Sequence, residues 1–114
     1  MPPKTVTDRL VFQIKADFLK ALAHPVRLEI IEYLRRTEAS VGTMVSDLDV
    51  EQSALSKHLA VLRQAGIVHS RQEKVTVFYS IRDRDIFLVL RPIAEILRKK
   101  LEESRAVLDR LAKD

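Results

Sequence analysis

Apolar residues near the start of the chain recur at helical spacing. One apolar residue stands at every fourth position, which is the period of a single helix face and predicts a helix over about residues 8–22. These positions are Leu10, Ile14, Phe18 and Leu22. Pro25 suits the first turn of a second helix, where its missing N–H has no partner in any case, and this helix is expected to end near Arg36. His24 is then interpreted as a turn or capping residue.

Two shorter helices and a hairpin are expected next. Ser40 is the predicted N-cap of a third helix, and residues 47–50 are interpreted as a turn. A fourth helix is expected from Gln52 until Gly66, a residue that permits a left-handed C-cap. Apolar and polar positions alternate over residues 67–82, which predicts two strands with Glu73 and Lys74 at the tip of the hairpin.

The last third of the chain returns to helical spacing and predicts one helix over residues 84–112. Pro92 lies inside this helix, so we expect a kink just before it or a break around residues 88–91. Asp83 and Asp85 precede the helix and are interpreted as N-terminal caps. The predicted fold is mainly helical, with five helices and a two-stranded hairpin in a single domain over residues 1–114, and residues 1–7 form a flexible tail.

Composition excludes several classes of function. There is no cysteine, so disulfides, thiolate metal sites and thiol redox sensing are excluded, and two glycines cannot form a Gly-rich phosphate loop. Short apolar runs and an N-terminus without an apolar stretch predict no membrane segment, no export and a cytoplasmic location. No arrangement of nucleophile, base or metal ligands rises above chance, so we expect neither an enzyme nor a cofactor.

The positive charge lies in the middle of the sequence. Residues 52–82 contain a single acidic residue and carry an excess equal to the whole net charge of +4. Their basic residues are Lys57, Arg63, Arg71, Lys74 and Arg82. Such an asymmetry suggests a polyanionic partner that is bound through one segment.

A helix-turn-helix is the arrangement predicted over residues 40–66, and its second helix presents a short polar face. A face of this kind fits the major groove of DNA, where Gln pairs with adenine and Ser or Lys meets base edges or phosphates. The hairpin over residues 67–82 would be a basic wing. The expected DNA-binding residues are Gln52, Ser53, Ser56, Lys57, His58, Arg63, Arg71 and Lys74. For His58 a phosphate contact and a hydrogen bond within the motif both remain open.

Three stretches of the sequence carry a resemblance to a known family. They are residues 19–31, residues 53–68 and residues 79–81, and the second contains the signature Ser-x-x-Ser-x-His-Leu-x-x-Leu-x-x-Ala-Gly. The chain resembles the ArsR/SmtB winged-helix regulators of prokaryotes. The resemblance implies a homodimer formed by the first and last helices, and a repressor that an effector removes from its operator. The expected interface residues are Leu10, Ile14, Phe18, Leu90, Ile93, Leu97, Leu101 and Leu108.

The sequence also departs from the metal sensors of that family. The third helix has no cysteine pair, and the zinc site of the last helix would need ligands where this chain has Ile96 and Lys99. We therefore expect no metal site and a signal that is neither a thiol nor a metal, with the effector itself unknown. The expected partner is double-stranded DNA with an imperfect palindromic operator. A protein-interaction module that has kept this shape is the alternative, against which the intact polar face argues.

Overall fold

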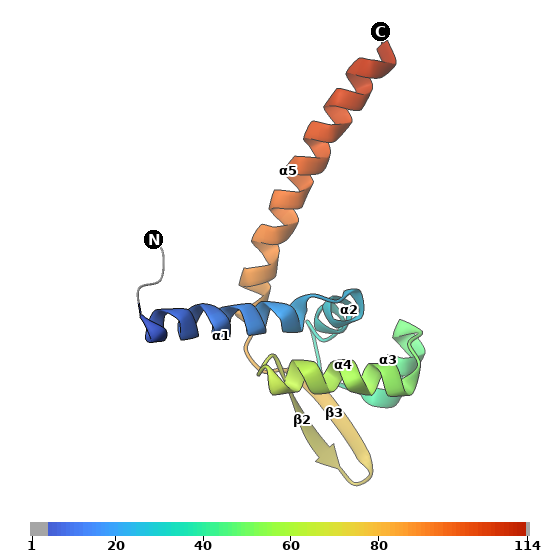
Figure 1. Cartoon of the computed structure of the whole chain (residues 1–114). Helices are drawn as coiled ribbons and strands as arrows, with labels where there is room; N and C mark the ends of the chain where they lie inside the picture. The colour runs from blue at the N-terminus through green and yellow to red at the C-terminus, as the bar shows by residue number, and fades with distance from the viewer. Residues whose placement is uncertain (1–4, 114) are drawn as a thin grey trace. The chain divides into compact units, whose positions relative to one another are not determined.

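A computed structural model describes residues 5–113 of the chain (Figure 1). The chain divides into two compact units after Arg82: the first contains α1 to β3, and the second is α5. The elements are α1 (Val6–Leu22), α2 (Pro25–Tyr33), β1 (Ala39–Ser40), α3 (Val41–Leu48), α4 (Gln52–Gln64), β2 (Val68–Glu73), β3 (Thr76–Ile81) and α5 (Ile86–Lys113). The five predicted helices are confirmed.

The first two helices begin at local capping signals. Thr5 caps α1 by accepting the N–H of Asp8 at 3.1 Å, so the helix starts at Val6 and the predicted tail of residues 1–7 is too long. Residues 1–4 of that tail lie outside the described part of the chain. The capping role of His24 is confirmed, because its Nδ1 accepts the N–H of Val26 at 3.1 Å with Pro25 in the first turn of α2.

The helix-turn-helix is formed by α3 and α4. Ser40 accepts the N–H of Thr43 at 3.2 Å and is the N-cap of α3, as predicted. Asp49 takes a left-handed conformation with φ 53° and ends this helix. Gly66, with φ 77°, ends α4, while Ile67 N donates to the carbonyl of Leu62 at 2.9 Å. These bonds form a Schellman motif, which confirms the left-handed cap that the sequence predicts at Gly66.

The sheet has three antiparallel strands in the order β1-β3-β2, and not two. The additional strand β1 is only two residues long and pairs Ala39 with Tyr79 and Ser40 with Phe78. Strands β2 and β3 form the wing, a hairpin that extends beyond the helices of its unit (Figure 1). Glu73 pairs with Thr76, so the tip is Lys74–Val75, one residue later than predicted. Lys74 has φ 56° there.

The core of the first unit surrounds the inner face of α4. Leu55, Leu59 and Leu62 are completely buried. The helix contacts α2, α3 and β2, which contribute buried residues of their own, Ile30, Ile31, Met44 and Val68 among them. Burying a side chain of this size stabilises a fold by about 1.5–3 kcal/mol, so α4 is firmly held from one side. Its opposite side remains free to meet a ligand.

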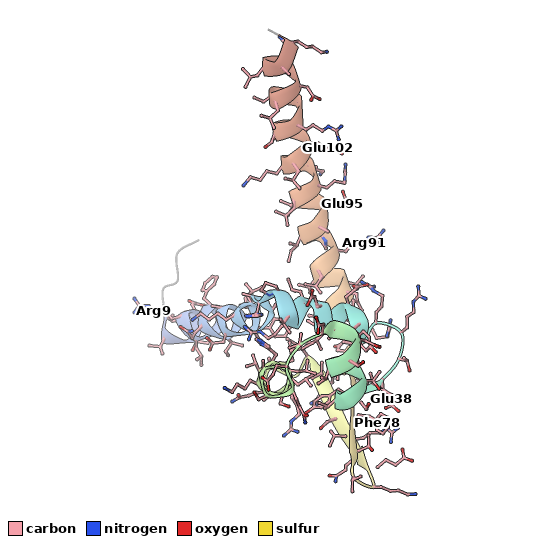
Figure 2. The ribbon with its side chains drawn as sticks, turned by 90° about the vertical axis from the view of Figure 1, so that its right-hand side faces the viewer. Arg9, Glu38, Phe78, Arg91, Glu95 and Glu102 are labelled. Carbon is pink, nitrogen blue, oxygen red and sulfur yellow. The ribbon has the colours of Figure 1, made fainter. Side chains whose placement is uncertain are left out.

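Helix α5 runs without interruption from Ile86 to Lys113 and passes through Pro92. Of the two predicted alternatives, a kink just before Pro92 and a break around residues 88–91, the break is therefore wrong. Proline removes a single N–H donor, whereas a break would also lose the hydrogen bonds of the neighbouring turns. Ile86 is the only buried residue of α5, and Arg98 forms ion pairs with Glu95 and Glu102, which are labelled in Figure 2. None of the helices within residues 5–113 is long and apolar enough to cross a membrane.

Candidate nucleic-acid interface

The outer face of α4 presents four polar side chains near its N-terminus. All four are exposed, while the leucines of the same helix are buried on the opposite side. We call them the reading face: Gln52, Ser53, Ser56 and Lys57. The structure thus brings together the four residues that the sequence indicates for contact with bases.

A hollow of about 560 Å³ connects the reading face with the wing. Gln52 and Ser56 line it from α4, Val41 and Gly42 from the start of α3, and Thr76 and Tyr79 are among its residues from β3. The recognition helix and the hairpin therefore border one continuous concave surface. A convex partner such as the backbone of a duplex could contact both elements at once.

Glu51 is the N-cap of α4 and was not among the residues predicted to bind DNA. Its carboxylate accepts the backbone N–H of Ser53 at 3.0 Å and that of Ala54 at 3.1 Å. It also accepts the hydroxyl of Ser53, with 2.6 Å between Oε2 and Oγ. These bonds, that of the Ser53 side chain first, lower the pKa of Glu51, so the group stays ionised at neutral pH. An N-cap position directly before the helix was the signal that could have identified it.

Arg71 is exposed in β2, but two carboxylates hold its guanidinium, and its predicted contact with DNA stays a prediction. Its guanidinium forms a two-pronged ion pair with Glu38, donating from Nε at 2.9 Å and from Nη2, and donates from Nη1 to Glu73 at 2.8 Å. It also lies 4.6 Å over the ring of Phe78 (Glu38 and Phe78 are labelled in Figure 2). The bonds to Glu38 and Glu73 raise the pKa of Arg71. Two carboxylates therefore neutralise this cation, and it fastens β2 to the segment that precedes β1.

The other two basic residues of this region differ in their surroundings. Lys74 is exposed at the tip of the wing and forms no ion pair within the described residues; its carbonyl accepts the side-chain amide of Gln72 at 3.1 Å. Arg63 is exposed near the end of α4 and donates from Nη1 to the hydroxyl of Ser70 at 3.3 Å. Of the two wing residues predicted to bind DNA, Arg71 is paired with carboxylates, whereas Lys74 forms no ion pair within residues 5–113.

His58 packs against residues of α2 and is less exposed than the reading face. It is half-buried, and its ring lies 4.2 Å from the ring of His24, centroid to centroid. The Nδ1 atom is 3.3 Å from Nη1 of Arg27, whose protons make His58 the acceptor. Burial, and then the charges of His24 and Arg27, lower the pKa of His58. The structure gives His58 a hydrogen bond within the protein, but its partner Arg27 lies in α2, outside the helix-turn-helix; the predicted phosphate contact stays a prediction.

The predicted interface residues of α1 and α5 are mostly exposed. Leu10 and Ile14 are 56% and 59% exposed, and Leu97, Leu101 and Leu108 are 52%, 69% and 65% exposed. Ile93 is also exposed, whereas Phe18 and Leu90 are half-buried. Leucines with half or more of their surface in water are unusual in such numbers, so each helix has an apolar face without a partner in its own unit.

The comparisons with known proteins agree with this geometry. A family model described as a helix-turn-helix domain matches residues 22–71. The helix-turn-helix-type transcriptional regulator Rv0081 of Mycobacterium tuberculosis is 40% identical over 102 residues, which cover 89% of this chain and 90% of the relative. The nodulation protein NolR of Rhizobium meliloti is 34% identical over 96 residues, 84% of this chain and 76% of NolR. A homologue of the transcriptional repressor SmtB in Synechocystis is 33% identical over 87 residues, 76% of this chain and 66% of that protein.

Solved structures extend the similarity to the fold. The crystal structure of Rv0081 superposes with a TM-score of 0.74 at 39% identity and covers 82% of this chain and 95% of its own. That of NolR from Sinorhizobium fredii gives a TM-score of 0.75 at 34% identity, covering 84% of this chain and 96% of its own. The chain belongs to the ArsR/SmtB family of winged helix-turn-helix transcriptional regulators. The family that the sequence motifs indicate is confirmed.

In this ArsR/SmtB-type regulator the inherited metal positions hold other groups. Within the described residues, no three His, Cys, Asp or Glu side chains gather closely enough to hold a metal ion. Asp83 accepts the backbone N–H of Asp85 at 2.9 Å and so shapes the turn before α5. This bond agrees with the interpretation of Asp83 as a capping residue.

Proposed function

We propose that this protein is a dimeric, sequence-specific repressor of transcription that acts on DNA in the prokaryotic cytoplasm. The observation that carries the proposal is the exposed reading face of α4 on the same hollow as the wing. A surface that joins the polar N-terminal end of one helix with a hairpin matches the major groove and the flanking backbone of a duplex. Membership of a family of transcriptional regulators supports the same function.

The two parts of this surface have different tasks in the proposal. Gln52 and Ser56 read base edges, since a glutamine amide pairs with adenine through two hydrogen bonds. Lys57 and Lys74 contact phosphates, which position the protein without selecting a sequence.

The proposed dimer buries the apolar faces of α1 and α5. In α5 a row of small or apolar residues recurs with spacings that alternate between four and three. This is the pattern of a helix that packs along another helix. We call this set the apolar seam: Leu90, Ala94, Leu97, Leu101, Ser104, Leu108 and Leu111. A two-fold dimer presents two reading faces, so the operator is an imperfect palindrome whose half-site centres lie about one helical turn apart.

The signal that releases the operator is proposed to be neither a thiol reaction nor a metal. The chain has no cysteine to supply a thiolate. The positions that would complete a zinc site in the last helix hold Ile96 and Lys99, an alkyl group and a cation that cannot bind zinc.

Selection of binding sites from a random duplex library tests the proposal. The wild-type protein is expected to enrich an imperfect palindrome, and Gln52→Ala to lose preference at one position of each half-site by roughly five-fold or more. Gln64→Ala, on the exposed face near the end of α4, is the matched control and should select the wild-type site. Failure of the wild-type protein to enrich any sequence would favour a protein-interaction module instead.

A further inference from the structure

Two side chains at the N-terminal end of α4, those of Glu51 and Ser53, offer hydrogen-bond acceptors to a ligand but no free donors. The ionised carboxylate of Glu51 can only accept hydrogen bonds. The hydroxyl of Ser53 lies 2.6 Å from Oε2 of Glu51, and since the carboxylate has no proton to give, Ser53 must donate its own. Ser53 therefore faces outward with lone pairs alone. We call Glu51 and Ser53 the acceptor tip.

Three backbone N–H groups at this end of the helix also donate to Glu51. The N–H groups of Ser53 and Ala54 point to the Glu51 carboxylate, and the N–H of Leu55 donates to the carbonyl of Glu51 at 2.9 Å. A helix N-terminus ordinarily attracts a phosphate through such free N–H groups and its positive dipole end. Here the protein's own carboxylate occupies two of these N–H groups, so the side chains of the acceptor tip repel phosphate and require donors from their ligand. The N–H of Gln52 forms no hydrogen bond within residues 5–113.

From this arrangement we infer that Glu51 is a specificity-determining residue, which makes the acceptor tip select a base with an exposed amino group. In the major groove cytosine offers its N4 amino group and adenine its N6 amino group, whereas guanine presents only the acceptors N7 and O6 there. The acceptor tip can therefore accept a hydrogen bond from cytosine or adenine. With guanine, acceptor atoms would face acceptor atoms and repel each other. The inference rests on the proposed DNA binding and adds to it a reading residue outside the reading face.

Substitution of Glu51 separates base reading from helix capping. In Glu51→Ser a good N-cap is kept, but the charge and the reach of the side chain are lost. We expect this variant to lose the preference for an amino base at one position of each half-site, by roughly ten-fold. Its affinity for random duplex should rise at the same time, because a negative charge is removed from the DNA-facing surface. In Glu51→Gln one capping oxygen remains and N–H donors are added, so this variant should accept guanine at the same position.

Site selection and quantitative binding with the full-length variants provide the test, and Glu29→Gln is the matched control. Glu29 is an exposed residue of α2, so its substitution removes one negative charge without touching α4. This control should keep the wild-type site. Should Glu51→Ser and Glu51→Gln both select the wild-type site with reduced thermal stability, Glu51 is a capping residue only and the inference is overturned. A wild-type protein that selects no site at all would overturn the proposed function itself, which is a different result.

Discussion

At the scale of single residues, the two cations predicted to bind DNA from the wing differ in their ion pairing. The guanidinium of Arg71 is matched by the carboxylates of Glu38 and Glu73, whereas Lys74 is exposed at the tip. A cation that is already paired releases few counterions from DNA when the complex forms, because its charge is neutralised beforehand. In the proposed complex with DNA, we therefore expect Lys74 to contribute more to phosphate binding than Arg71.

This difference predicts separate effects of two substitutions. Lys74→Ala should reduce the slope of log affinity against log salt concentration by about one for each subunit. Arg71→Ala should leave that slope nearly unchanged and lower the melting temperature, since Glu38 loses its partner and β2 its tie to the segment before β1. Titrations of operator DNA at several salt concentrations, with thermal melts of the same samples, measure both effects. Equal slopes for the two variants would contradict the assignment.

His58 predicts a pH dependence of stability. In the folded chain its Nδ1 accepts a hydrogen bond from Arg27, and burial lowers its pKa below the ordinary value of 6.5. The unfolded state therefore binds a proton first as the pH falls below about 6.5, so this part of the stability is complete above that pH and is lost below it.

The variant His58→Gln keeps an acceptor for Arg27 but does not titrate. The free energy of unfolding should fall less between pH 7 and pH 5 in His58→Gln than in the wild-type protein, as measured by urea denaturation. The exposed imidazole of His69 in β2 supplies the control variant, His69→Gln. Parallel pH profiles for wild type and His58→Gln would show that His58 is not the group involved.

The contacts of these residues also show which interactions can be predicted from the sequence and which cannot. The caps at Ser40 and His24 could be predicted, because the residue and the N–H that it binds lie within three positions of each other. Arg71 pairs with Glu73, two residues away, but its other partner, Glu38, is 33 residues away, and the partner of His58 is 31 residues away. No local pattern reveals these two distant partners, so the surroundings of Arg71 and His58 could not be predicted in full.

At the scale of elements, Gly66 and Gly42 form a matched pair. A Cβ atom added at either position would meet nothing within 4 Å, so packing does not distinguish them. Gly66 has φ 77° at the end of α4, whereas Gly42 lies in α3 with ordinary helical backbone.

Gly66→Ala should lower the free energy of unfolding by about 1–2 kcal/mol, which is the cost of a left-handed conformation for a residue with a Cβ. Gly42→Ala should raise it by up to about 1 kcal/mol, because alanine loses less backbone freedom in a helix. Chemical denaturation of both variants checks the pair. The same sign for both would mean that the Schellman turn at Gly66 does not limit stability.

The five helices follow from periodicity and caps, whereas the third strand does not. The strand β1 is two residues long, too short for any alternation, and exists through its pairing with Tyr79 and Phe78, far along the chain. For a related reason, the sequence left open whether α5 continues through Pro92 or breaks before it. A proline predicts a local loss of one hydrogen bond, but whether the helix continues depends on all the other bonds around it.

At the scale of the whole molecule, dimerisation predicts a sharp difference between two substitutions in α5. Leu97→Glu places an unpaired charge in the apolar seam and should dissociate the dimer, since that charge has no partner in an apolar interface. Ser104→Glu adds the same charge where the seam already has a polar side chain, and should weaken association less. Light scattering at micromolar concentration measures the mass. A wild-type protein with the mass of a single chain would contradict the proposed dimer.

Helix α5 buries almost none of its side chains, and this affects how many DNA-binding dimers the proposed function allows in a cell. A helix that buries only Ile86 gains little from its own unit, so a partner must supply most of the energy that keeps it folded. In the proposed dimer, folding of this helix and association are then one equilibrium, and mass action governs both. Dilution would melt α5 and remove DNA-binding pairs together, so occupancy of a palindrome would rise more steeply than the number of chains synthesised.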